Sequence, residues 1–170
     1  MQTTVKLYTY DFTAIKTYAV AALFIIGNIL MPQLFHLIPR GGLIWLPIYF
    51  FTLIGAYKYG WKVGLLTALV SPVVNCVLFG MPPVAGLPAI IVKSSLLALA
   101  AGFTAGHYKK VSIALLTAVV LTYQVAGTLI EWAMARDFMA AIQDFRIGIP
   151  GMLLQIFGGY LLIRYVIRKI

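Results

Sequence analysis

The sequence predicts an all-α polytopic membrane protein, a single domain over residues 1–170 with six transmembrane helices and cytoplasmic N- and C-termini. Three observations support this fold class. Of the 170 residues, 62% are hydrophobic and 10% are charged, whereas soluble domains average about 25% charged residues. Apolar stretches close to the ~20 residues needed to cross a bilayer recur along the whole chain. The Lys and Arg residues are divided unequally between the two sides of these stretches.

The predicted spans are separated by turns that are mostly rich in proline or glycine. In chain order the connections read MPQLFHLIPRGG, YKYGWK, FGMPPVAGLP, GHYKK and ARDFMAAIQDFRIGIPG. Proline lacks an amide hydrogen and glycine tolerates positive φ, so both residues favour such breaks. The last connection is the longest and the most charged, and the second span is the shortest. The six spans are 12–31, 43–58, 62–79, 88–106, 111–134 and 148–167.

The positions of the basic residues set the expected orientation. Lys and Arg in short loops favour the cytoplasmic side. With both termini inside, nine of the 13 basic residues fall on the cytoplasmic side. The positive-inside distribution is enough to explain the net charge of +9. We therefore expect no nucleic-acid partner. The four basic residues assigned to the outer side are Arg40, Lys93, Arg136 and Arg146.

Strongly polar side chains inside the spans predict a ligand pocket. Such groups are costly in a bilayer and usually face the protein interior or a cavity. Five of the six spans place one in the outer half of the membrane at similar depth, whereas the inner half is mainly apolar. This distribution favours a pocket that opens outward over a channel, which is polar along its whole length. The candidate substrate-binding residues are Asn28, Trp45, Tyr49, Asn75, Lys93, Gln124, Glu131 and Gln155.

These residues also have a purely structural interpretation. Lys93 could extend to the membrane surface, and the amides could bond neighbouring helices. Lys93 and Glu131 could also neutralise each other as an ion pair, which is compatible with either interpretation. In the pocket interpretation, Trp45 and Tyr49 supply aromatic walls and Gln124 lies deeper.

The sequence offers few groups for catalysis or metal binding. A single cysteine, Cys76, excludes an intramolecular disulfide, and the two histidines, His36 and His107, lie far apart. An intramembrane enzyme could use Glu131 with His36, but Glu131 has no second carboxylate at acid/base spacing. We therefore expect no enzyme activity, no catalytic residues, no cofactor and no metal site. The alternative is that Cys76 is a ligand to the cobalt of a corrinoid.

One stretch of the chain resembles a known family. Tyr57 to Phe103, YKYGWKVGLLTALVSPVVNCVLFGMPPVAGLPAIIVKSSLLALAAGF, contains a basic-glycine turn, a GLLTALVSP helix, a Gly/Pro turn and a small-residue helix. Together with six short spans, this pattern is similar to the substrate-binding S component of energy-coupling factor (ECF) vitamin transporters. The family often carries an Ala-xxx-Ala pattern on the first span, where this chain has Ala19, Ala21 and Ala22 without that spacing.

The resemblance implies high-affinity binding and uptake of a vitamin or vitamin-like micronutrient. It implies a bacterial or archaeal cytoplasmic membrane, an ECF T component and two ATPase subunits as partners, and a loop from Met31 to Gly42 that closes the site. In this function Lys93 would hold an anionic group of the ligand, and the other polar candidates would orient it. The alternatives are a solitary cobalamin- or corrinoid-binding S component that uses Cys76, and a membrane scaffold without transport.

Overall fold

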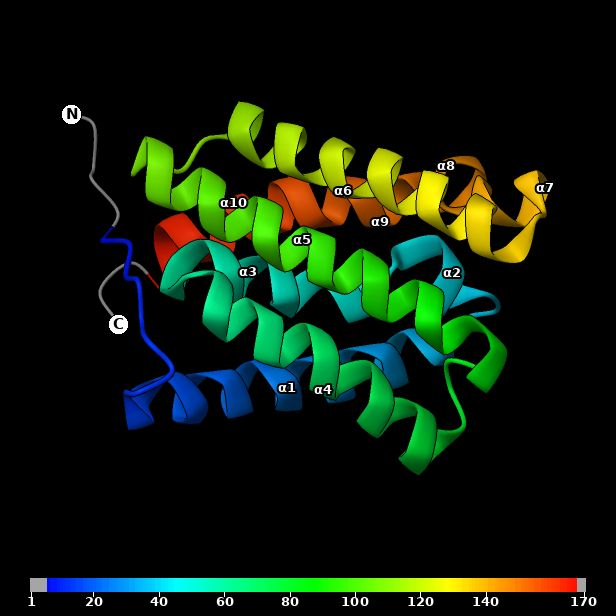
Figure 1. Cartoon of the computed structure of the whole chain (residues 1–170), viewed down its shortest axis with the longest axis horizontal. Coiled ribbons are helices and arrows are strands. Elements are labelled where there is room, and N and C mark those ends of the chain that lie inside the picture. The colour runs from blue at the N-terminus through cyan, green and yellow to red at the C-terminus, as the bar shows by residue number, and fades with distance from the viewer. Residues whose placement is uncertain (1–5, 168–170) are drawn as a thin grey trace.

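The computed structural model describes residues 6–167, and the elements in this part of the chain are all helices. Within residues 6–167, five helical segments are long and apolar enough to cross a membrane. They lie side by side as a bundle (Figure 1). The chain therefore has the helices of a multi-pass membrane protein. The segments are α1 (Ile15–His36), α4 (Trp61–Phe79), η2 with α5 (Val84–Gly86 and Leu87–Tyr108), α6 (Ile113–Ala135) and the C-terminal segment Ile149–Val166.

The C-terminal segment changes its helical type along its length. It consists of α9 (Ile149–Leu153), the π-helix η3 (Leu154–Gly158), α10 (Gly159–Leu161) and the π-helix η4 (Leu162–Val166). π-Helical turns are rare and are found frequently at functional sites. The predicted span 148–167 is thus confirmed as a helix of spanning length, and its π-helical turns are an irregularity that hydropathy does not predict.

The predicted span 43–58 is broken and is not among the five spanning helices. It consists of α2 (Gly41–Trp45), the 3-10 helix η1 (Pro47–Tyr49) and α3 (Phe50–Tyr59). Leu46 separates α2 from η1 with a left-handed φ of 47°, and the proline that follows has no amide hydrogen to continue a helix. Nine of the ten α3 residues are buried. The six-span count is therefore supported for five spans, and the remaining segment is a broken element with a buried helix.

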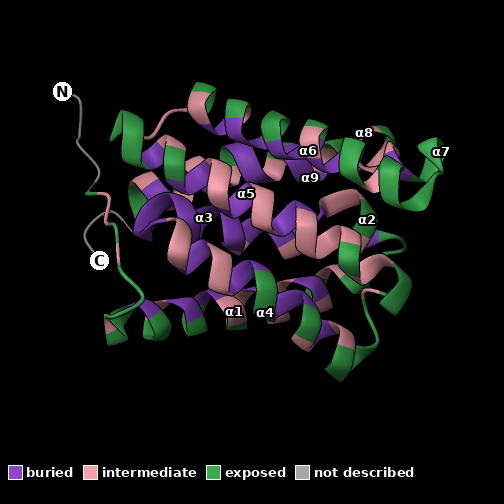
Figure 2. Ribbon diagram, in the orientation of Figure 1, coloured by how far each residue is buried: buried purple, intermediate pink, exposed green. Residues whose placement is uncertain are grey.

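The outward faces of the long helices are apolar. On α1, for example, Leu23, Ile26 and Leu30 are exposed by 66%, 54% and 58%. Figure 2 shows the same division along the bundle, with buried residues on the inner faces and exposed residues on the outer ones. An apolar outer surface of this kind is what lipid contact requires. The helices therefore present to their surroundings the surface expected of membrane spans.

The connections gather at two ends of the bundle (Figure 1). The α7 end holds α2, η2, α7 (Phe138–Ala141) and α8 (Gln143–Ile147). The opposite end, called the Tyr8 end, holds residues 6–14, the Gly60 turn, the α5–α6 connection and η4. The three connections assigned to the outer side thus share one end. Which end faces the cytoplasm stays a prediction, and Arg168 and Lys169 lie outside the described residues.

Buried amides tie three helices together. Asn28 on α1 donates from Nδ2 to Thr52 Oγ1 on α3 at 2.9 Å and to Ser71 Oγ on α4 at 3.2 Å. Its Oδ1 accepts from the amide of Phe51 at 3.1 Å. Asn75 donates to the backbone oxygens of Asn28 and Ser71 at 2.9 and 3.0 Å. Interhelical hydrogen bonds of this kind hold spans together where lipid offers no hydrophobic driving force.

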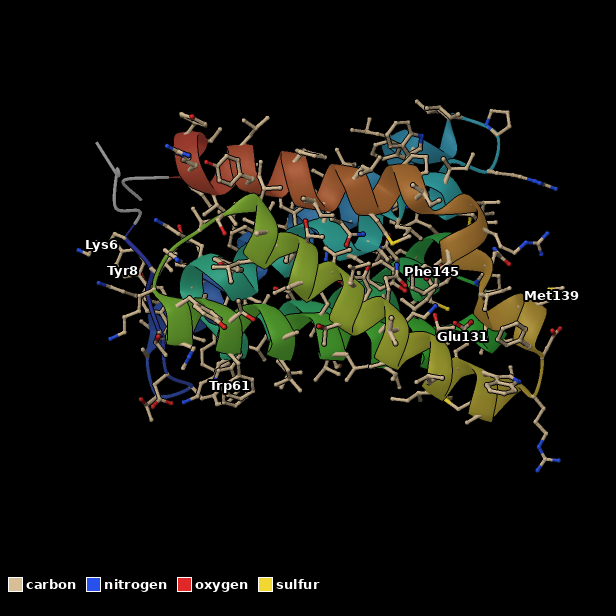
Figure 3. The ribbon with its side chains drawn as sticks, turned by 90° about the horizontal axis from the view of Figure 1, so that it is seen from above. Lys6, Tyr8, Trp61, Glu131, Met139 and Phe145 are labelled. Carbon is tan, nitrogen blue, oxygen red and sulfur yellow. The ribbon has the colours of Figure 1, made fainter. Side chains whose placement is uncertain are left out.

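Residues 8–11 bind to the end of α3 and the start of α4 at the Tyr8 end (Figure 3). The amides of Tyr8 and Tyr10 donate to the carbonyls of Lys58 and Tyr59 at 2.8 and 3.1 Å. Asp11, just before α1, pairs with Lys62 at 2.7 Å. The hydrogen bond from the Lys62 ammonium holds the pKa of the Asp11 carboxyl below its ordinary value of 3.8.

Candidate ligand-binding site

A buried lysine lies between two carboxylates near the α7 end. Lys93, in the second turn of α5, places Nζ 2.5 Å from Glu131 Oε2 and donates to Asp144 Oδ2 at 2.8 Å. Its side chain is 4% exposed, against 23% for Glu131 and 13% for Asp144. We call these three residues the triad. Because α5, α6 and α8 each contribute one member, the triad links three parts of the fold.

A glycine makes room for the lysine. A Cβ atom added to Gly127 on α6 would lie 2.5 Å from Lys93 Cγ, closer than real Cβ contacts allow. The aliphatic stem of Lys93 therefore runs directly over Gly127. This close approach of α5 and α6 brings the ammonium to Glu131, which follows Gly127 by one helical turn.

The ion pair between Lys93 and Glu131 confirms one of the alternatives considered from the sequence. Asp144 was missed, because it lies in the connection after the fifth span and sequence depth could not be assigned to it. The scarcity of acidic residues could have drawn attention to it, since the chain has only four Asp and Glu residues and Asp144 is one of them. With its three groups ionised, the triad carries one net negative charge.

The triad forms part of the wall of a cavity of about 490 Å³ at the α7 end. We call it the end cavity. Its wall comes from the end of α1, the connection to α2, η1, the Met81–Gly86 turn, the start of α5, the end of α6, and α7 with α8. Tyr49 and Lys93 are its buried residues with polar side-chain atoms, whereas His36 and Arg40 are exposed lining residues. The end cavity is thus mainly apolar, with charged groups from several elements.

Three predicted site residues line the end cavity, and the others do not. Tyr49, Lys93 and Glu131 belong to its wall. Trp45 on α2 instead packs its ring against Phe35, with centroids 5.5 Å apart. The predicted residues that are not among those lining the cavity are Asn28, Trp45, Asn75, Gln124 and Gln155. The two asparagines instead form the interhelical hydrogen bonds described above.

The two predicted glutamines meet in a buried network beside the cavity. Gln124 Nε2 donates to the Tyr123 hydroxyl at 3.1 Å, and this hydroxyl donates to Gln155 Oε1 at 2.9 Å. The ring of Tyr123 lies 5.5 Å from that of Tyr49, which lines the cavity. Gln155 belongs to η3. Gln124 Oε1, Gln155 Nε2 and Thr128 Oγ1 are buried without a hydrogen-bond partner.

The other residues considered for chemistry lie apart. Cys76 is a free, half-buried thiol on α4 and is not among the residues lining the end cavity. His36 lines the cavity from its exposed side. Residues 6–167 contain no group of three His, Cys, Asp or Glu side chains able to hold a metal ion.

Comparisons of the chain with protein-family models, with curated proteins and with solved structures gave no match. The class of protein is therefore described from its helices and its cavity. The chain has the features of a multi-pass membrane protein with a ligand-sized cavity at one end of its helical bundle.

Proposed function

We propose that the chain binds a vitamin or vitamin-like micronutrient in the end cavity, as the S component of an ECF transporter. The observation that carries the proposal is the cavity itself, whose volume of about 490 Å³ falls within the roughly 300–1,000 Å³ of small-molecule sites. Its mainly apolar wall with a few convergent polar groups is also typical of such sites. The resemblance of Tyr57 to Phe103 to S components supplies the transport context.

The remaining parts of the proposal follow from the positions of the elements. Residues of the α1–α2 connection form part of the cavity wall, as the proposed closing loop from Met31 to Gly42 requires. The positive-inside rule assigns the Tyr8 end to the cytoplasm, so the cavity opens outward. An ECF T component and two ATPase subunits would act at the cytoplasmic side of a bacterial or archaeal membrane. The role is binding and uptake rather than catalysis.

The position of Cys76 outside the cavity wall gives no support to cobalt ligation. The other alternative, a membrane scaffold that binds no ligand, is distinguished from the proposed function by one binding experiment. The experiment is calorimetry of the purified full chain in detergent against a panel of vitamins and vitamin precursors. We expect at least one member to bind with a Kd of about 1 μM or below, which corresponds to about 8 kcal/mol of binding free energy.

Two glycines offer a matched pair of variants for this test. Gly86 lines the end cavity, Gly106 lies exposed near the other end of α5, and a Cβ atom at either position meets nothing within 4 Å. The first side-chain atom of a larger residue therefore meets no other atom at either place. Gly86→Trp should abolish binding by occupying the cavity, and Gly106→Trp should preserve it. Binding of no panel member by the parent protein would contradict the proposal and favour a scaffold.

A further inference from the structure

The ammonium of Lys93 already forms ion pairs with two carboxylates of the protein. An ammonium has three donors and is a compact charge. Two carboxylates lie within 2.8 Å of Nζ, and the side chain is 4% exposed. A ligand carboxylate that approached Lys93 would also meet Glu131 and Asp144, because all three groups line the same cavity. Like charges at such distances repel strongly in a site that is partly shielded from water.

The two carboxylates keep unused acceptor capacity. Each ionised carboxylate accepts about four hydrogen bonds. Lys93 contacts one oxygen of each, Glu131 Oε2 and Asp144 Oδ2. Among the interactions found for residues 6–167, no other side chain donates to either carboxylate. The cavity wall at the triad is therefore an acceptor surface with one net negative charge.

Polar side-chain atoms without hydrogen-bond partners continue along α6. Thr128 and Gln124 precede Glu131 by three and seven residues, which places them on the same helical face. Thr128 is 7% exposed and Gln124 fully buried, and neither Thr128 Oγ1 nor Gln124 Oε1 has a hydrogen-bond partner. Two other buried atoms without a partner among the described residues can donate, Gln155 Nε2 in the adjoining network and the Ser94 hydroxyl next to Lys93 on α5. Unpaired oxygens thus lie on the α6 face that leads from the triad into the bundle.

The other permanent cation in the cavity wall is exposed to water, which weakens its attraction for an anionic ligand. Apart from Lys93, the lining residue with a permanent positive charge is Arg40, which is exposed in the α1–α2 connection. Charges in contact with water are screened within about 8–10 Å at ordinary salt concentrations. The part-buried triad therefore dominates charge selection by the cavity.

We infer that the end cavity takes a small organic ligand that presents a protonated amine or a cationic nitrogen heterocycle to Glu131 and Asp144. Lys93 is then a positioning residue that holds the two carboxylates beside each other. This inference rests on the proposed function and narrows its substrate class. It also replaces the expectation that Lys93 holds an anionic group of the ligand.

The test uses probes that differ in charge on similar scaffolds. Pyridoxamine, pyridoxine and 4-pyridoxate carry an ammonium, a hydroxyl and a carboxylate on one ring, and thiamine adds a cationic heterocycle. Pantothenate, biotin and nicotinate form the anionic set. Calorimetry of the purified full chain should show binding of a cationic probe. Glu131→Gln and Asp144→Asn, which come from different helices, should each weaken that binding at least tenfold.

A third carboxylate supplies the control for charge alone. Asp137 is exposed at the same end of the bundle, caps α7 and does not line the end cavity. Asp137→Asn changes the net charge by the same amount and should leave binding unchanged. A melting curve of each variant in detergent establishes that it is folded, and the two site variants provide independent readings if one is unstable.

Each contrary result has a distinct meaning. The parent protein could bind an anionic probe, with the same or higher affinity in Glu131→Gln and Asp144→Asn. This result would overturn the inference and leave the proposed function standing. An equal loss in Asp137→Asn would reduce the effect to general charge and would also overturn the inference. Binding of no probe in the larger vitamin panel would overturn the proposed function, and the inference with it.

Discussion

Replacing Lys93 with methionine should destabilise the folded chain markedly. Methionine keeps the length and apolar contacts of the lysine stem over Gly127 but removes the ammonium. Glu131 and Asp144 would then remain side by side without a counter-charge in a part-buried site. Removing one member of a buried ionic cluster is costly because the uncompensated charges stay behind.

The distances give the size of the effect. At an effective dielectric constant of about 20, unit charges 2.5 and 2.8 Å apart attract each other by about 6 to 7 kcal/mol per pair. Desolvation of the lysine offsets much of this sum, and measured losses on breaking a buried pair are about 3–5 kcal/mol. The carboxylates are 23% and 13% exposed, so we take the lower value of about 3 kcal/mol. This corresponds to a fall in melting temperature of roughly 6–12 °C.

Thermal unfolding in detergent, followed by tryptophan fluorescence, measures this loss. The matched control is the triple variant Lys93→Met, Glu131→Gln, Asp144→Asn, in which the unpaired charges are also removed. We expect the triple variant to recover most of the lost stability, because neutral amides can remain in the site at smaller cost. A Lys93→Met protein that melts within about 2 °C of the parent would show that the two carboxylates do not need the ammonium, since this shift corresponds to less than about 1 kcal/mol.

Three further predictions concern other parts of the bundle. Asn28→Leu should lower the melting temperature of the apoprotein, since it leaves buried partners unsatisfied at about 1–3 kcal/mol each; ligand affinity measured well below the melting temperature of the variant should stay within threefold of the parent, and a larger loss would place the residue in the binding site. Gly127→Ala should push the Lys93 stem off α6 and weaken binding of a cationic probe more than tenfold in calorimetry, whereas unchanged affinity would show that the close approach is not required. Asp11→Asn should melt slightly below the parent at neutral pH, because a carboxyl with a lowered pKa contributes stability above the unfolded pKa and loses it as pH falls through the folded pKa; the two melting curves should converge as pH falls below the ordinary carboxyl range or in high salt, and a difference that does not shrink in high salt would exclude the Lys62 pair as its cause.

Much of the bundle could be predicted from hydropathy, because spanning length and apolar composition are properties of single segments. The exception is the segment 43–58, whose composition is as apolar as that of the spans. Its break at Leu46 and Pro47 depends on backbone dihedral angles that composition does not reveal. The burial of α3 was equally hidden, since a helix inside a membrane bundle and a helix facing lipid are both apolar.

The site could be predicted only in part. Lys93 and Glu131 were found because a charge inside an apolar run is conspicuous at the sequence level. Asn28 and Asn75 lie at a similar predicted depth, but they face neighbouring helices, and the direction of a side chain depends on helix rotation in the bundle. Asp144 could not be placed, because a connecting segment has no periodicity from which to infer its return to the bundle.

Native mass spectrometry of the full chain, purified in detergent from the membranes in which it is made, shows whether the end cavity holds a ligand. We expect a non-covalently bound small organic molecule on the parent protein and on Gly106→Trp. The same molecule should be absent from Gly86→Trp, because Gly86 lines the end cavity and we expect the added ring to fill part of it. An equal amount of bound molecule on all three proteins, or none on any of them after growth in vitamin-rich medium, would contradict the assignment of the end cavity as the ligand site.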